Sequence, residues 1–361
     1  MQKKYEKLMR KCISLAKKYE GRTSPNPLVG AIIFDDDFNI ISMGAHQKCG
    51  QNHAERNAIL STNEELKGKN LIVNLEPCSH HGKTPPCADL IIEKGFKKVI
   101  IGMEDPNPIV KGKGIKKLQD AGIEVVLDVL KEECEELNKI FIKNIIGKKP
   151  YITMKSAITF DGKIATKTGN SKWITDEKSR KEVQKIRNYH DAILTSSQTV
   201  IMDNPSLTCR MKNGKNPIRI ILDSKLSTSP DSKVYNNDGV KVYLLTTQKD
   251  NKQYPKNVEV ITVEEKNNHI NLTKAIEILY DKGIKSILVE TGGTLNKAFL
   301  EENLIDELIL FIAPKILGDK TGINFIEGFN RTELSQCNNL TITKVQKLKN
   351  DIMITAKFKG I

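Results

Sequence analysis

The sequence has few cysteines and few aromatic residues, and it has no long apolar run. Its 361 residues include seven cysteines and one tryptophan, and 5% of them are aromatic. An odd, thinly spread set of cysteines is not a disulfide framework and is typical of a reducing compartment. No stretch approaches the roughly 18 apolar residues of a membrane span, and no apolar segment of a secretion signal follows the basic residues 1–11. We therefore expect a cytoplasmic protein with no membrane partner.

Charge is the feature that the sequence has in excess, with a formal net charge of +13. A nucleic-acid-binding protein would group its basic residues and place aromatic side chains among them to stack on bases. Here the lysines are scattered along the chain and the aromatic residues are scarce. We expect no nucleic-acid partner. The positive field also suits small phosphorylated ligands.

Strand and helix patterns alternate along the whole chain. Residues 28–34 and 97–105 have the composition of buried strands, whereas 5–19, 112–122 and 131–147 have helical periodicity. Such alternation predicts an α/β fold with a mainly parallel sheet covered on both faces. The polar segment 147–150 divides two blocks without internal repetition, so we expect two domains, residues 1–147 and 150–361.

Two short motifs in the first block carry metal chemistry. Residues 53–55 read His-Ala-Glu, and residues 74–87 read NLEPCSHHGKTPPC. His53, Cys78 and Cys87 supply the nitrogen and thiolate ligands that zinc prefers, and they leave a fourth position for water; iron and cobalt are the alternatives. Glu55 is then placed to move a proton without ligating the metal, as in the zinc-dependent base deaminases.

Eight residues separate the two cysteines, where the general deaminase signature has two. The longer segment is expected to contact substrate, because His80 and Lys83 offer a donor and a cation for a phosphate, while His81 is expected to be solvated. Asn26 and His46 lie at predicted strand ends that face the same site. Each of them has an alternative role without function: Asn26 could simply form a turn, and His46 could be a surface histidine.

These residues resemble a known family. The segments PNPLVG, GAHQKCGQNHAE and LEPCSHHGKTPPC are similar to the deaminase half of the bifunctional riboflavin-biosynthesis deaminase/reductase, and MKSAITFDGKIAT, SKWIT, TVIMDNPSLTCR and VETGGTLNKAFLE to its reductase half. The resemblance covers nearly the whole chain. It implies a cytidine-deaminase-like three-layer domain, then a dihydrofolate-reductase-like domain. It also implies two steps: zinc-dependent deamination of a phosphorylated diaminopyrimidine riboside, and NADPH-dependent reduction of its ribosyl chain.

The second block alone is harder to interpret, because no G-x-G-x-x-G follows a strand. The strand, two glycines and helix around Gly292 and Gly293 could hold a phosphate on exposed amides. The resemblance implies deaminase pocket residues Asn26, His46, His80 and Lys83. It implies reductase substrate contacts from Ser171, Arg187, Leu207, Arg210 and Glu290, with the two arginines facing the phosphate. It implies cofactor contacts from Ala157, Trp173, Thr199, Asp203, Ser224, Gly292 and Gly293; Lys155 is added to these as a candidate for polarising the reducing end.

Two other functions are weighed against this one. A tRNA deaminase with a basic binding domain would need grouped cations and stacking aromatics. A deaminase with a non-catalytic second domain would not be expected to keep all the reductase segments together. The predicted partner is a small phosphorylated pyrimidine, and such enzymes are commonly homo-oligomers.

Overall fold

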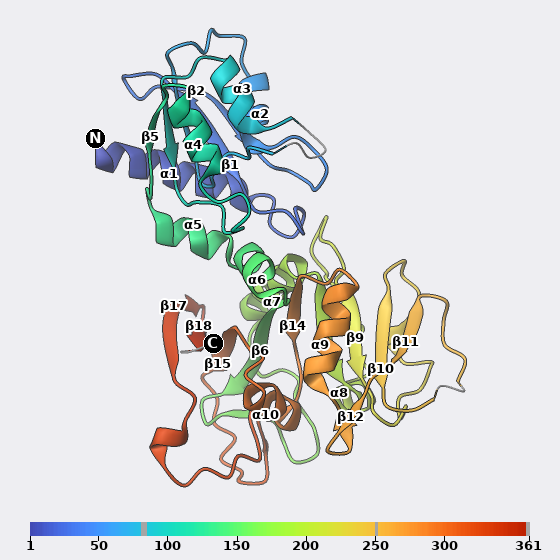
Figure 1. The fold of residues 1–361 in the computed structure, drawn as a ribbon. Coiled ribbons are helices and arrows are strands. Elements are labelled where there is room, and N and C mark those ends of the chain that lie inside the picture. The colour runs from blue at the N-terminus through green and yellow to red at the C-terminus, as the bar shows by residue number, and fades with distance from the viewer. Residues whose placement is uncertain (81–84, 250–251, 359–361) are drawn as a thin grey trace. The chain divides into compact units, whose positions relative to one another are not determined.

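The computed structural model describes residues 1–80, 85–249 and 252–358, and it divides into two compact units, Met1–Lys148 and Lys149–Ile361 (Figure 1). Each unit is described by itself. Among the described residues, no helix combines the length and the apolar character that crossing a membrane requires.

The first unit is built on a five-stranded sheet in the order β2-β1-β3-β4-β5. The strands are β1 Gly30–Phe34, β2 Ile40–Ala45, β3 Asn70–Val73, β4 Lys98–Ile101 and β5 Glu124–Val126. β1 is antiparallel to β2 and β3, whereas β3, β4 and β5 are parallel. The expected parallel arrangement holds for β3, β4 and β5, and it fails only at β1, which runs opposite to both of its neighbours. The connection from β1 to β2 is a short turn in which Asp35 accepts hydrogen bonds from the amides of Asp37 and Asn39, too short for a parallel crossover.

Helices cover both faces of this sheet. α1 (Gln2–Lys17) contacts α5 (Lys131–Leu137), while α2 (Ala54–Leu60) contacts α3 (Cys87–Glu93), which in turn contacts α4 (Lys113–Asp120). Every residue of β1 and β3 is buried, as a strand between two layers requires. The result is a three-layer unit whose second helix begins directly after His53.

The single helix expected over residues 131–147 is interrupted. It ends at Leu137, and α6 (Lys139–Gly147) follows as a separate helix. Between them, the buried Asn138 side chain accepts a hydrogen bond from the Leu28 amide at 2.8 Å and donates one to the Leu28 carbonyl at 3.2 Å. This tertiary bond satisfies a backbone segment 110 residues away, so helical periodicity alone could not show the break.

The second unit is built on a nine-stranded sheet in the order β11-β10-β9-β8-β14-β6-β15-β18-β17. All neighbours from β11 to β15 are parallel, which confirms the expectation for this half, and β18 and β17 (red in Figure 1) close one edge as an antiparallel pair. The strands are β6 Tyr151–Thr159, β8 Ala192–Ser196, β9 Ile218–Leu222, β10 Val242–Thr246, β11 Val258–Thr262, β14 Ser286–Val289, β15 Glu307–Ala313, β17 Leu340–Leu348 and β18 Asp351–Phe358.

Alternate residues of these strands enter two different cores. Leu194 and Leu222 pack in the cluster that contains α9 (Leu272–Asp281) and α10 (Gly293–Glu301), whereas Ile193 and Ile221 pack in another that contains Val200 of α8 (Ser197–Asp203). α7 (Glu177–Tyr189) contributes Ile186 to that second core. The remaining elements are the short strands β7 Lys163–Ala165, β12 Glu265–Lys266, β13 His269–Ile270 and β16 Ile323–Asn324, and the 3-10 helices Lys233–Tyr235 and Leu334–Gln336.

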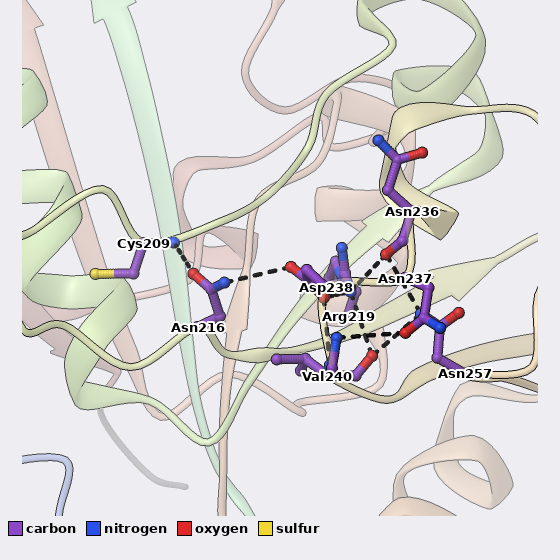
Figure 2. A network of polar contacts seen from close by, with 9 residues as sticks. Cys209, Asn216, Arg219, Asn236, Asn237, Asp238, Val240 and Asn257 are labelled. Atoms are coloured by element: carbon purple, nitrogen blue, oxygen red, sulfur yellow. Dashed lines mark hydrogen bonds and ion pairs between the residues drawn. The ribbon is translucent and has the colours of Figure 1, made fainter.

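A buried arginine fixes the loops beside β9. Arg219 is 1% exposed, and its Nη2 donates to Asp238 Oδ1 at 2.5 Å and to the carbonyls of Asn236 and Val240 at 3.3 Å. Figure 2 shows the network that these bonds belong to, which continues through Asn216 to the amide of Cys209. The network holds the segment before β10 against the loop that carries Arg210.

Candidate active sites

The predicted zinc ligands converge in the first unit. His53 is the N-cap of α2, Cys87 is the first residue of α3, and Cys78 follows the strand-to-loop segment after β3. His53 Nδ1 lies 3.5 Å from both Cys78 Sγ and Cys87 Sγ, and all three ligand atoms lie within 4.8 Å of one another. A tetrahedral zinc with bonds of about 2.1 Å to nitrogen and 2.3 Å to sulfur would separate nitrogen from sulfur by about 3.6 Å. The donor set therefore fits zinc in type and spacing.

Glu55 lies within one turn of this group. Its carboxyl is 3% exposed and forms a hydrogen bond with the Cys87 thiol. Burial, together with the charge of Cys78, raises the pKa of Glu55 to about 7, and a cation held by the three ligands would oppose that shift. A carboxyl group that binds and releases a proton so close to the metal position is suited to general acid–base work.

The other predicted deaminase residues divide into two groups. Asn26 and His46 meet beside the metal group, with Asn26 Nδ2 at 3.1 Å from His46 Nε2, and the His46 ring packs edge-on against His53. Burial lowers the pKa of His46, and the Asn52 carbonyl at 3.0 Å holds its other ring nitrogen. His80 is exposed on the segment after Cys78. Lys83 and His81 lie outside the described residues.

One candidate in this unit escaped the sequence analysis. Asp105 follows β4 at the sheet edge, close enough to His80 and Cys78 for their charges to act on its carboxyl group. Burial raises the pKa of Asp105. The sequence signal was a turn-forming Asp-Pro-Asn-Pro after a buried strand, which by itself is typical of any loop.

The second unit contains a cavity of about 1480 Å³ at the carboxyl ends of its parallel strands, which is where open α/β sheets bind ligands. Twelve of the thirteen predicted reductase residues line it: Lys155, Ala157, Ser171, Trp173, Arg187, Thr199, Asp203, Arg210, Ser224, Glu290, Gly292 and Gly293. Leu207 does not. It is 5% exposed and packs in the core cluster with Val200.

A buried charge cluster forms the base of this cavity. Glu290 accepts from Arg187 Nε at 3.1 Å and from Arg187 Nη2 at 2.8 Å, and Lys155 Nζ lies 3.3 Å from the same carboxylate. Burial alone would raise the pKa of Glu290, but the two cations lower it to about 2. Burial lowers the pKa of Lys155. Arg187 also donates to the Thr208 carbonyl at 3.1 Å, so most of its donors are engaged within the protein.

Trp173 and Gly292 present open surfaces to the cavity, whereas Gly293 is closely packed. Trp173 is 60% exposed, and the guanidinium of Arg180 lies 4.6 Å from its ring centre. Trp173 is therefore not a core residue. A Cβ on Gly292 would meet nothing within 4 Å, so the amides at the start of α10 are accessible, whereas one on Gly293 would come within 2.5 Å of the Asn324 carbonyl.

Comparisons with known proteins follow the same division of the chain. Residues 2–103 match the family described as the cytidine and deoxycytidylate deaminase zinc-binding region, and residues 150–354 match the RibD C-terminal domain. The riboflavin biosynthesis protein RibD of Actinobacillus pleuropneumoniae is 42% identical over 351 residues, 96% of this chain and 93% of that protein. RibD of Escherichia coli is 39% identical over 340 residues, 90% of this chain and 92% of that protein.

Solved structures agree with these sequence relatives. A diaminohydroxyphosphoribosylaminopyrimidine deaminase/5-amino-6-(5-phosphoribosylamino)uracil reductase from Thermotoga maritima superposes with a TM-score of 0.91 at 40% identity and covers 99% of both chains. Acinetobacter baumannii RibD gives a TM-score of 0.88 at 32% identity, covering 99% of this chain and 100% of that one. The expected fold class is confirmed: a cytidine-deaminase-like domain precedes a dihydrofolate-reductase-like domain.

Proposed function

The chain belongs to the RibD family, whose members join a zinc-dependent deaminase to an NADPH-dependent reductase in riboflavin biosynthesis, and from this we propose the substrates and the residues of each step. The first substrate is 2,5-diamino-6-ribosylamino-4(3H)-pyrimidinone 5′-phosphate. Its hydrolytic deamination is followed by reduction of the ribosyl chain, which gives 5-amino-6-ribitylaminouracil 5′-phosphate. The convergence of His53, Cys78 and Cys87 on one point carries the proposal for the first step.

In the deaminase unit, these three residues would hold zinc, which lowers the pKa of a bound water. Glu55 takes a proton from the attacking water and delivers it to the leaving amine, so that ammonia departs as a neutral molecule. Asn26 and His46, bonded to each other beside the metal group, orient the pyrimidine. His80 and Lys83 bind the phosphate on the ribose.

In the reductase unit, the cavity holds NADPH and the deaminated product together. Gly292 and Gly293 offer amides to the cofactor pyrophosphate, while Trp173, Thr199, Asp203 and Ser224 line the rest of its path. Lys155, whose ammonium group is held by Glu290, polarises the reducing end of the ribosyl chain. A lysine whose pKa is lowered by burial is also a better proton donor than a free lysine.

The two phosphate-binding arginines predicted from the sequence are not equivalent. Arg187 is committed to Glu290 and to the Thr208 carbonyl, whereas Arg210 has no carboxylate partner among the described residues. We assign Arg210 to the substrate phosphate, and Arg187 chiefly to holding Glu290. Ser171 lines the cavity and completes the substrate contacts; Leu207 would act from the core behind it.

We also infer that the chain forms a homo-oligomer through the edge of the second sheet. β17 is the last strand of the sheet, and its residues Leu340, Ile342 and Val345 are exposed by 36%, 60% and 63%. A contiguous apolar strand surface on a sheet edge is unusual for a monomer. A second copy of the same strand is the occupant that a two-fold axis would place there.

A single time course tests the two-step function. Purified protein is given the diaminopyrimidine ribosyl phosphate with NADPH, and ammonia release and NADPH oxidation are recorded together, before and after the metal is stripped. Ammonia is expected first, NADPH loss is expected to lag, and stripping is expected to stop both, with zinc restoring them. NADPH oxidation should survive stripping only when the deaminated product is supplied.

Two outcomes would contradict the proposal. Ammonia release without NADPH oxidation would show that the second unit does not reduce this product. If metal-replete protein gives neither signal, the substrate assignment is wrong, and tRNA deamination is the next activity to measure.

A further inference from the structure

Asp223, the residue after β9, is fully engaged within its own turn. Its Oδ1 accepts from the amide and hydroxyl of Ser227, each at 2.9 Å, and its Oδ2 from the amide and hydroxyl of Thr228, each at 2.8 Å. The residue is 1% exposed. Enzymes that use NADH commonly place an acidic residue at a strand end to bind the ribose 2′-hydroxyl. This carboxylate has no remaining acceptor to offer to a ligand.

The residues around Asp223 present the opposite chemistry to the cavity. Ser224, Lys225 and Ser227 all line it, and Lys225 and Ser227 are exposed. Among the described residues, the Lys225 ammonium has no carboxylate within 4 Å and no hydrogen-bond acceptor within the protein. Asp223 also lines the cavity, but its carboxylate is engaged by Ser227 and Thr228, and the Ser227 hydroxyl proton is used in that bond. The turn therefore offers one cation, Lys225, and one free hydroxyl donor, Ser224, with no carboxylate free to compete.

Most other cations of the cavity wall differ from Lys225, because a carboxylate partner or an aromatic ring already engages them. Lys155 and Arg187 contact Glu290, Lys266 contacts Glu302 at 2.7 Å, and Lys297 contacts Glu301 at 2.8 Å. Within the described part of the wall, the cations that lack a carboxylate partner are Lys167, Arg180, Arg210 and Lys225. Arg180 stacks on Trp173, and Arg210 lies on the loop after β8 and α8. Lys225 alone stands at the end of β9.

The distance between Lys225 and the two glycines, Gly292 and Gly293, matches the length of a nucleotide. β9, β8 and β14 are consecutive parallel strands, so their carboxyl ends share one edge of the sheet. Gly292 follows β14, two strand intervals from the end of β9, which is about 10 Å at the usual strand spacing. An adenosine diphosphate whose pyrophosphate binds at the start of α10 can reach the β9 end with its ribose.

We propose that Lys225, with the hydroxyl of Ser224, binds the 2′-phosphate of NADPH and gives the reductase its preference for NADPH over NADH. The proposal rests on the cofactor site proposed above. A cation and a hydroxyl donor suit a phosphate dianion, and the four hydrogen bonds that Asp223 accepts within its turn offset the negative charge that would repel it. The 2′-hydroxyl of NADH finds no free carboxylate in this turn and gains nothing from the cation.

The test compares Lys225→Met with Lys233→Met, a matched exposed lysine outside the cavity wall. KM and kcat are measured with the deaminated product for NADPH and for NADH, and the turnover with NADH reports that the second unit is folded. K225M is expected to raise the KM for NADPH about tenfold or more, because a hydrogen bond to a charged group is lost, and to leave kcat and the KM for NADH unchanged. K233M is expected to change neither.

Binding of cofactor fragments gives a readout that does not depend on turnover. Trp173 is the only tryptophan and faces the cavity, so its fluorescence reports binding of 2′,5′-ADP and of 5′-AMP. K225M is expected to weaken 2′,5′-ADP and to spare 5′-AMP. Equal weakening of both, or of neither, would overturn the assignment of Lys225. If wild-type protein binds no NADPH at all, it is the proposed cofactor site that is wrong.

Discussion

Glu76 shows how much a single side chain contributes to the deaminase unit. Its carboxylate is buried and accepts from four backbone amides: those of Asp105 and Gly112 at 3.0 Å, Gly114 at 2.9 Å and Ile115 at 3.3 Å. Glu76 precedes Pro77 and Cys78, so these bonds attach the start of α4 and the loop before it to the segment that carries a proposed metal ligand. No pattern in the sequence distinguishes Glu76 from a surface glutamate.

Glu76→Gln should therefore destabilise the first unit by about 2–4 kcal/mol, because the amide NH₂ would face backbone donors that are left without an acceptor. Urea unfolding followed by far-UV circular dichroism measures this, with Glu65→Gln as the exposed control in the same unit. Equal unfolding midpoints for the two variants would show that the four bonds are replaceable.

Glu290 makes the stability of the second unit depend on pH. Its pKa is lowered from 4.5 to about 2 in the folded protein. A depressed pKa stabilises the folded state above the unfolded value, and this contribution is lost as the pH falls from about 4.5 to about 2. The loss is on the order of 3 kcal/mol, since each pKa unit corresponds to about 1.4 kcal/mol.

Glu290→Gln should flatten that part of the pH dependence, although the variant is less stable throughout because Arg187 and Lys155 lose their partner. The free energy of unfolding of the second unit is measured between pH 5 and pH 2, with Glu301→Gln as a surface carboxylate control. The same acid slope in wild type and E290Q would mean that other carboxyl groups govern acid unfolding.

At the scale of elements, the C-terminal hairpin was not predicted from the sequence. β17 and β18 complete the large sheet, yet β17 has exposed side chains on both faces, so it lacks the alternation of a strand on a monomeric core. Two other features were missed for a related reason. The helix break at Asn138 depends on hydrogen bonds to Leu28, far away in the chain, and the antiparallel pairing of β1 with β2 depends on the short turn between them.

The exposed strand leads to a prediction about assembly. Ile342→Glu together with Val345→Glu should lower the mass of the native protein to that of a single chain, because charges would be buried at the proposed contact. Light scattering coupled to gel filtration measures this, and Thr341→Glu, whose side chain leaves the same strand on its other face, is the control. A single-chain mass for the wild type, or an unchanged mass for the double variant, would rule out this edge as the interface.

At the scale of the whole molecule, each set of catalytic candidates lies within one compact unit. The metal group and its neighbours belong to Met1–Lys148, and the cavity wall belongs to Lys149–Ile361. The two chemistries need different environments. One needs thiolates around a metal, and the other needs a long groove for two phosphorylated ligands. Separate cores allow each site its own geometry.

The sequence by itself pointed to the three residues proposed as metal ligands, to the α/β character of both halves and to the family to which the chain belongs. These follow from residue types at fixed short spacings and from hydrophobic periodicity, which are local properties. Only the tertiary structure decided that Arg187 is held by a glutamate 103 residues away, that Leu207 packs in a core, and that Asp223 turns inward and leaves Lys225 facing the cavity. A side chain's partners depend on which distant segments the fold brings together, and no local pattern encodes that choice.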